Sequence, residues 1–153
     1  MHITPASPTD LPAITQLFRA YAATLPVDFC TQGFDEEVAS LPGQYAPPAG
    51  ALLIARNEQA AALGCIAMRP LGNGVAEMKR LYVAPEGRGR GLGRALTQAI
   101  ITTARAAGHT ELRLDTLTHM REAQALYRTL GFTEIAPYND NPPNITLFMS
   151  LKL

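Results

Sequence analysis

The chain has 153 residues, a length that suits one domain with its own hydrophobic core, and we expect a single domain over residues 1–153. Apolar residues make up 47% of the chain, and 13 Lys and Arg balance 13 Asp and Glu, so the formal net charge is zero. This balance argues against general binding to nucleic acid or to a membrane surface, because both usually require an excess of basic residues.

The sequence also indicates where the protein resides. No apolar run approaches the roughly 20 residues of a membrane span, and the first residues lack the basic and apolar segments of a secretion signal. The two cysteines, Cys30 and Cys65, form neither a disulfide framework nor a spacing that binds metal. We therefore expect a cytoplasmic protein without a metal site.

The first third of the chain alternates between helical and irregular segments. Residues 1–6 are predicted to form a strand, and Ser7-Pro8-Thr9-Asp10 is typical of a helix start, since Ser caps helices and Pro suits the first helical position. Apolar residues at helical spacing continue from Leu11 to Tyr21. A short helix over residues 35–41 and a loop rich in Pro and Gly follow.

The rest of the chain is richer in strands. The periodicity predicts strands over residues 51–56, 60–68, 75–83, 112–114, 132–136 and 145–151, and helices over residues 92–107 and 120–130. The predicted order of elements is βααβββαβαββ, which indicates the α/β class with a mixed sheet.

A glycine-rich segment, Arg88-Gly89-Arg90-Gly91-Leu92-Gly93-Arg94, lies between a predicted strand and a predicted helix. Glycines let the backbone approach a ligand closely, and the first turn of a helix presents N–H groups that carry partial positive charge. Such a segment is typical of a phosphate site. It lacks the Lys-Ser/Thr ending of the nucleotide phosphate loop and the glycine spacing of the dinucleotide fingerprint.

Residues 88–93 fit a different pattern, Arg/Gln-x-x-Gly-x-Gly/Ala, and the chain thereby resembles the GNAT N-acetyltransferase superfamily. A second motif resembles the superfamily's C-terminal signature, Asn-x-x-Ala-x-x-Leu-Tyr-x-x-x-Gly-Phe. The matching residues are Ala123, Leu126, Tyr127, Gly131 and Phe132. Met120 replaces the Asn, which in relatives often contacts the pantetheine arm. Residues 77–83 also look like a subgroup of small bacterial GNAT proteins.

The resemblance implies a GNAT fold that binds acetyl-CoA as co-substrate. The strand that ends at Val83 would splay from the strand over residues 112–116, and the V-shaped gap would hold the pantetheine arm against Leu81, Tyr82 and Val83. The pyrophosphate would lie on the N–H groups of the glycine-rich segment, formed by Arg88, Gly89, Arg90, Gly91, Leu92, Gly93 and Arg94. Among the arginines, Arg88 and Arg90 are stronger phosphate neighbours than Arg94, whose side chain could lie along the helix.

The implied reaction is direct transfer of an acetyl group to a primary amine, without a covalent enzyme intermediate. The amine must lose a proton, since an alkylammonium has a pKa of about 10.4. The resemblance places Tyr127 near the thioester sulfur as general acid, with ring packing in the core as the alternative. Glu77 is the candidate general base, and a structural ion pair with Lys79 is its alternative. Strand alternation would place Glu77 on one face with Lys79, Leu81 and Val83.

Recognition of the acceptor is expected at the open end of the groove, from Tyr21, Asp28, Phe29 and Tyr138. The acceptor would be a small-molecule or protein amine, and the acids Asp28, Glu36 and Glu37 would favour a cationic one unless they are merely solvated. Relatives are often dimers, so a homodimer is a further expectation.

Two other functions compete with an acetyltransferase. The Met120 departure would suit a non-catalytic acyl-CoA-binding sensor or regulatory module. A nucleic-acid-binding Arg-Gly segment is disfavoured, because such segments are long and disordered.

Overall fold

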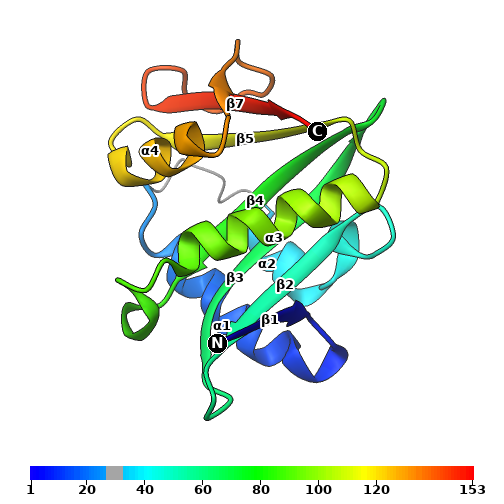
Figure 1. The fold of residues 1–153 in the computed structure, drawn as a ribbon, viewed down its shortest axis with the longest axis vertical. Helices are drawn as coiled ribbons and strands as arrows, with labels where there is room; N and C mark the ends of the chain where they lie inside the picture. The colour runs from blue at the N-terminus through cyan, green and yellow to red at the C-terminus, as the bar shows by residue number, and fades with distance from the viewer. Residues whose placement is uncertain (27–32) are drawn as a thin grey trace.

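The computed structural model describes residues 1–26 and 33–153. It contains one seven-stranded sheet in the order β1-β2-β3-β4-β5-β7-β6 (Figure 1). The strands are β1 (His2–Pro5), β2 (Ala51–Arg56), β3 (Ala62–Gly72), β4 (Val75–Val83), β5 (Glu111–Leu117), β6 (Thr133–Glu134) and β7 (Thr146–Lys152). The α-helices are α1 (Leu11–Ala22), α2 (Phe34–Ala39), α3 (Leu92–Ala106) and α4 (Arg121–Thr129). The order βααβββαβαββ and the mixed sheet are as predicted, since β4 and β5 are parallel and the other pairs are antiparallel.

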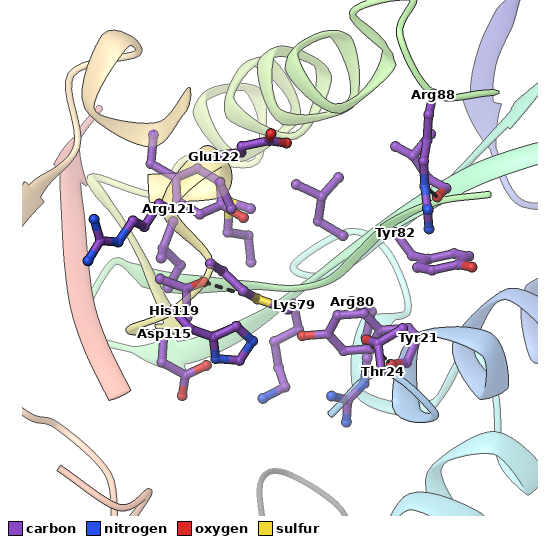
Figure 2. A pocket seen from close by; sticks show the side chains of 18 residues that line it. Tyr21, Thr24, Lys79, Arg80, Tyr82, Arg88, Asp115, His119, Arg121 and Glu122 are labelled. Atoms are coloured by element: carbon purple, nitrogen blue, oxygen red, sulfur yellow. Dashed lines mark hydrogen bonds between the residues drawn. The ribbon is translucent and has the colours of Figure 1, made fainter. Parts of the chain in front are cut away.

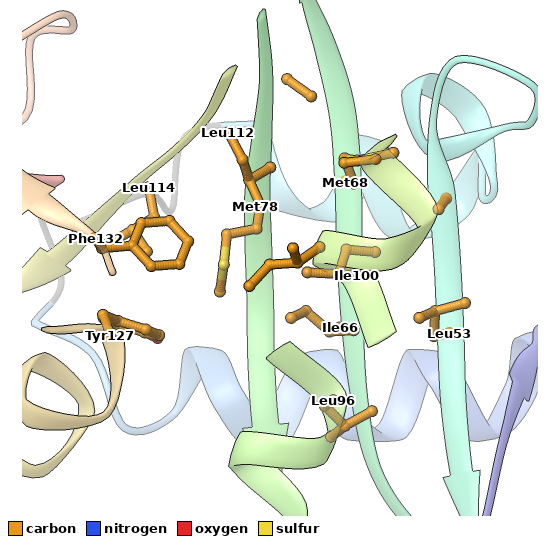
Figure 3. Close-up of a cluster of buried hydrophobic side chains, with 14 of the residues drawn as sticks. Leu53, Ile66, Met68, Met78, Leu96, Ile100, Leu112, Leu114, Tyr127 and Phe132 are labelled. Carbon is orange, nitrogen blue, oxygen red and sulfur yellow. The ribbon is translucent and has the colours of Figure 1, made fainter. Parts of the chain in front are cut away.

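Helices cover both faces of the sheet. Figure 1 shows α3 across one face, with α1 and α2 behind the sheet. The apolar stripe of α3 packs on β2, β3 and β4, where Leu96, Ile100 and Met68 are fully buried (Figure 3). Full burial of one such side chain contributes roughly 1.5–3 kcal/mol. Tyr127 and Phe132 extend this core to α4.

Several strand bounds differ from those predicted, most clearly in β3, β5 and β6. β5 runs from Glu111 to Leu117 instead of over residues 112–114. β3 does not end at Met68 but continues to Gly72, because the register shifts between Pro70 and Gly72 and so accommodates the proline. β6 is only two residues long, since Phe132 turns into the core and only Thr133 and Glu134 pair with β7.

A bulge interrupts β4 at Arg80. Its φ of 62° is uncommon for a residue other than glycine. The register changes at this point, since Lys79 pairs with Ala67 whereas Tyr82 pairs with Cys65. β4 therefore carries one more residue than β3 between these pairs, and an extra residue bends a strand and reverses its side-chain alternation.

The bulge overturns the expected common face of β4. Met78 belongs to the core under α3, so its neighbours Glu77 and Lys79 lie on the opposite face, toward α1 and α2. After the bulge, Leu81 and Val83 pack against the core under α3. The prediction that Glu77 and Lys79 share a face with Leu81 and Val83 is wrong, because it assumed an uninterrupted pleat.

The two parallel strands separate early. β4 and β5 pair only over residues 75–77 and 111–113, and then diverge (Figure 1). This is the V-shaped splay that the resemblance implied, and it opens toward the end of β4 that leads into the glycine-rich segment. Among the helices of the described residues, none is long and apolar enough to cross a membrane.

Candidate functional site

A cavity of about 660 Å³ occupies the splay (Figure 2). Its walls come from the end of β4, the middle of β5, the start of α4, and Tyr21 and Thr24 at the end of α1. Because β5 pairs with only three residues of β4, the edge of Leu81, Tyr82 and Val83 that faces β5 has no strand partner there. The cavity therefore lies against a free strand edge that can hydrogen-bond an extended ligand.

The glycine-rich segment adjoins this cavity at Arg88. Gly89 and Gly91 have φ values of 80° and 71°, and Gly91 is the N-cap of α3. A Cβ at either glycine would meet no atom within 4 Å, so the backbone angles, rather than packing, favour glycine there. The N–H groups of the first turn of α3 lack helical partners and form a positive end beside open space.

The three arginines of the segment have different surroundings. Arg88 lines the cavity, and its Nε donates a hydrogen bond to the Val83 carbonyl at 3.1 Å. Arg90 is exposed and makes no ion pair or hydrogen bond with its side chain to any described residue. Arg94 donates to Thr129 on α4 at 3.0 Å, so its side chain lies along the helix pair, as expected.

Gly93 and Leu92 have structural positions in α3. Leu92 is 2% exposed and packs in the core, so only its backbone can contribute to a ligand site. A Cβ at Gly93 would lie 3.8 Å from Leu126, an ordinary contact between α3 and α4.

Tyr127 lies on α4 in the cavity wall. It is 6% exposed and its ring contacts Phe132 edge-on, with 5.8 Å between centroids. Burial, together with the nearby Tyr21 and Asp115, raises the pKa of its phenol, so the group keeps its proton at neutral pH. The residue therefore combines both expected features, since its ring packs in the core and it reaches the cavity.

Glu77 lies outside the cavity lining, in a buried polar cluster. Its side chain is 1% exposed; it accepts hydrogen bonds from Arg69 Nε at 2.9 Å and from the Tyr138 hydroxyl at 2.6 Å. Lys79 Nζ lies 3.7 Å away. Burial alone would raise the pKa of Glu77, but Lys79, Tyr138 and Arg69 together lower it below the usual value. A carboxylate with a lowered pKa and occupied oxygens is a poor acceptor of a proton.

The residues expected to bind the acceptor are only partly together. Tyr21 lines the cavity, and its ring lies 6.5 Å from that of Tyr82. Tyr138 does not line the cavity, since its hydroxyl is bonded to Glu77 and its ring packs on Phe148 at 5.3 Å. Asp28 and Phe29 lie outside the described residues.

Sequence reasoning did not select several residues of the cavity wall. Asp115 lines the cavity and accepts hydrogen bonds from Asn139 at 2.7 Å and Asn141 at 2.8 Å. His119 is exposed and also lines the cavity beside Asp115 (Figure 2). The alternation of β5 could have indicated Asp115, because its side chain must point away from the core that buries Leu114.

Met120 occupies the N-cap position of α4 and lines the cavity. Its sulfur accepts a hydrogen bond from the Thr116 hydroxyl at 3.8 Å. The turn before α4 is held by Gln124, whose amide donates to the carbonyls of Leu117 and Thr118. The departure from Asn therefore places a thioether, instead of an amide, in the cavity wall.

A free strand edge in a splay between parallel strands, next to a glycine-rich helix start, is the arrangement of an acyl-CoA-dependent acetyltransferase. Residues 14–132 match the model of the acetyltransferase (GNAT) family. An uncharacterised N-acetyltransferase of Schizosaccharomyces pombe is 40% identical over 148 residues, which cover 95% of this chain and 90% of the yeast protein. The chain therefore belongs to the GNAT acetyltransferase family. The expected bacterial subgroup is not singled out, since this relative is fungal.

Solved structures agree with the fold. A Klebsiella pneumoniae protein, provisionally described as an acyl-CoA N-acyltransferase, is 33% identical with a TM-score of 0.78, covering 99% of this chain and 97% of its own. A phosphinothricin acetyltransferase of Sinorhizobium meliloti, solved in complex with acetyl-CoA, has a TM-score of 0.76 at 21% identity. The alignment covers 99% of this chain and 88% of that one. The α/β fold with its open mixed sheet is thus the GNAT fold.

Proposed function

We propose that this protein is an acetyl-CoA-dependent N-acetyltransferase that moves an acetyl group directly to a primary amine on a small molecule or a protein. The observation that carries the proposal is the cavity in the β4–β5 splay, which joins Tyr127 in its wall to the glycine-rich start of α3 through Arg88. The family match supports the same activity.

The residues around the cavity suit acetyl-CoA along its length. The first turn of α3 and the arginines Arg88 and Arg90 offer N–H groups and positive charge for a pyrophosphate. The free edge of β4 at Leu81, Tyr82 and Val83 offers backbone groups for the amides of a pantetheine arm. When bound, acetyl-CoA supplies a thioester whose acyl carbon bonds to the amine nitrogen as the thiolate leaves.

Tyr127 is proposed as the general acid. A leaving thiolate must gain a proton or a hydrogen bond, and the raised pKa keeps the phenol protonated until that moment. Its position on α4 is fixed by the core contact with Phe132. Tyr21, which also lines the cavity, is proposed to contact the acceptor.

The base role of Glu77 stays a prediction that its surroundings do not support. Its oxygens are held by Arg69 and Tyr138, and its side chain does not reach the cavity. Within the described part of the cavity wall, the side chains that carry a carboxylate or an imidazole are Asp115, His119 and Glu122. We propose that the proton of the amine leaves through these groups or through water at the cavity mouth.

The first test is calorimetric titration with acetyl-CoA, with Gly91→Asp as the matched variant. Asp adds an anion and a side chain where φ is 71°, so micromolar binding by the wild type should be lost in the variant. Circular dichroism checks that the variant is folded. Absence of binding by the folded wild type would contradict the proposal.

The second test separates an enzyme from a binding module. Thiol release from acetyl-CoA should depend on an added amine and should fall at least tenfold in Tyr127→Phe, while the Kd for acetyl-CoA stays within twofold. Binding of acetyl-CoA without release of thiol in the presence of any amine would favour the acyl-CoA-binding module.

A further inference from the structure

Lys79 lies between the main cavity and a second one. The second cavity, of about 490 Å³, is bounded by α2, the residues that follow it, and the facing parts of β3 and β4. Lys79 lines both cavities, and its side chain is only 11% exposed. Figure 2 shows its ammonium and the Arg80 guanidinium extending from β4 to the same side of the main cavity. Lys79 thus presents a nearly buried cation where the two cavities meet.

The carboxylates near Lys79 are already bonded to other donors. Glu37 accepts two hydrogen bonds from Arg80, at 2.9 and 3.0 Å. Glu77 accepts one from Arg69 and one from Tyr138, at 2.9 and 2.6 Å. Each of these carboxylates therefore accepts its hydrogen bonds from donors other than Lys79.

Lys79 forms an ion pair with Glu77 but has no hydrogen-bonded partner among the described residues. Its Nζ lies 3.7 Å from the nearest Glu77 oxygen, beyond hydrogen-bond length, and it donates no hydrogen bond to any described residue. The cluster holds three cations, Arg69, Lys79 and Arg80, against two carboxylates, the buried Glu77 and the partly buried Glu37. Glu36 also lines the second cavity, but it is exposed and its charge is screened by water.

The three N–H donors of the Lys79 ammonium therefore remain available to a ligand in either of the cavities that Lys79 lines. An anion placed at Lys79 would accept a hydrogen bond from it and would balance the third cation of the cluster. Arg69 can contribute to the same anion, since it uses Nε for Glu77 and Nη1 for Gln44 and keeps Nη2 without a hydrogen-bond partner among the described residues.

We infer that the acceptor amine carries a carboxylate, which binds Lys79 at the junction of the two cavities. The acceptor is then a small amino acid or a similar zwitterion, with its amine directed into the main cavity toward Tyr127. This inference rests on the proposed function, since only an acceptor for transfer would need its amine there. It replaces the expectation of a cationic acceptor, because the charge of Glu37 is balanced by Arg80 and Lys79 would repel a second cation.

The test compares acceptors that differ only in charge. Thiol release from acetyl-CoA is measured with a panel of free amino acids, each paired with its α-carboxamide, and with spermidine as a cationic amine. The best free acid should exceed its carboxamide at least tenfold in kcat/KM. In Lys79→Met the ratio of kcat/KM for the free acid to kcat/KM for its carboxamide should fall below three. Lys79→Arg should keep the preference for the free acid. Lys152→Met changes the other lysine of the chain, which is exposed at the end of β7, and should also keep it.

The outcomes are distinct. Carboxamides or spermidine reacting as well as free acids in the wild type would overturn the inference and leave the proposed function intact, even if Lys79→Met failed to fold. An unchanged preference in folded Lys79→Met would also overturn it. No thiol release with any amine would contradict the proposed function itself, and the inference with it.

Discussion

Replacing Glu77 by Gln tests whether this residue is catalytic or structural. The variant keeps the shape of the side chain but removes its charge and turns one acceptor oxygen into a donor. The Tyr138 hydroxyl, now 2.6 Å from Glu77 Oε2, would lose its acceptor, and Arg69 and Lys79 would lose the charge between them. Breaking a buried ion pair costs about 3–5 kcal/mol, and Arg69, being 33% exposed, places this case near the lower end.

We therefore expect Glu77→Gln to lower the free energy of unfolding by about 3 kcal/mol. For a chain of this size that corresponds to a fall in Tm of roughly 6–12 °C. Differential scanning calorimetry measures the change. The matched control is Glu111→Gln, since Glu111 is also a strand carboxylate bonded to an arginine but is 27% exposed. Glu111→Gln should lower the free energy of unfolding by less than about 1 kcal/mol.

The kinetic result decides the role. At a temperature where the variant is folded, kcat should stay within fivefold of the wild type and the pH dependence of kcat/KM should not move. A loss of kcat above a hundredfold, with an unchanged Tm and the disappearance of one limb of the pH profile, would refute this reasoning and establish Glu77 as the base.

Three further predictions concern stability. Gly64→Ala should lower the free energy of unfolding, measured by guanidinium titration, by about 2 kcal/mol, because the alanine Cβ would lie 2.8 Å from the Tyr82 carbonyl oxygen. Ile100→Ala should cost about 3 kcal/mol in the same assay, since Ile100 is fully buried under α3. The folded-state pKa of Glu77 is lowered, so the charged Glu77 should stabilise the fold above about pH 4.5, and this stabilisation should be lost as the pH falls through the folded pKa. The melting temperatures of wild type and Glu77→Gln should therefore converge as the pH falls below 4.5 and through the lowered pKa of Glu77.

The order of elements and the position of the glycine-rich segment at the start of α3 were predictable because their signals are local. The start of α3 was indicated by Gly91 and by the helical spacing of apolar residues that begins at the next residue, Leu92. Tyr127 was found in the same way, through a contiguous motif on one helix. Each of these predictions needed only residues close together in the sequence.

The surroundings of Glu77 were not predictable because they depend on distant residues. Tyr138 lies 61 positions away in the sequence, and Arg69 reaches Glu77 only because β3 and β4 pair in one particular register. The bulge at Arg80 left no sequence signal either, since a positive φ is usually marked by glycine, asparagine or aspartate, and here it falls on an arginine. A side-chain alternation that ignores the bulge places Glu77 on the same face of β4 as Leu81 and Val83, and the structure places it on the other face.

The same bulge explains how one strand can serve both substrates. Before it, Lys79 faces α2 and the second cavity, on the side where we place the acceptor. After it, Leu81 and Val83 face α3, and the strand edge runs on toward Arg88 and the glycine-rich segment. Arg80 itself is held at the turning point by its paired hydrogen bonds to Glu37 on α2. In our proposal, the reversal of alternation at Arg80 lets β4 present Lys79 to the acceptor on one face and its free edge to acetyl-CoA.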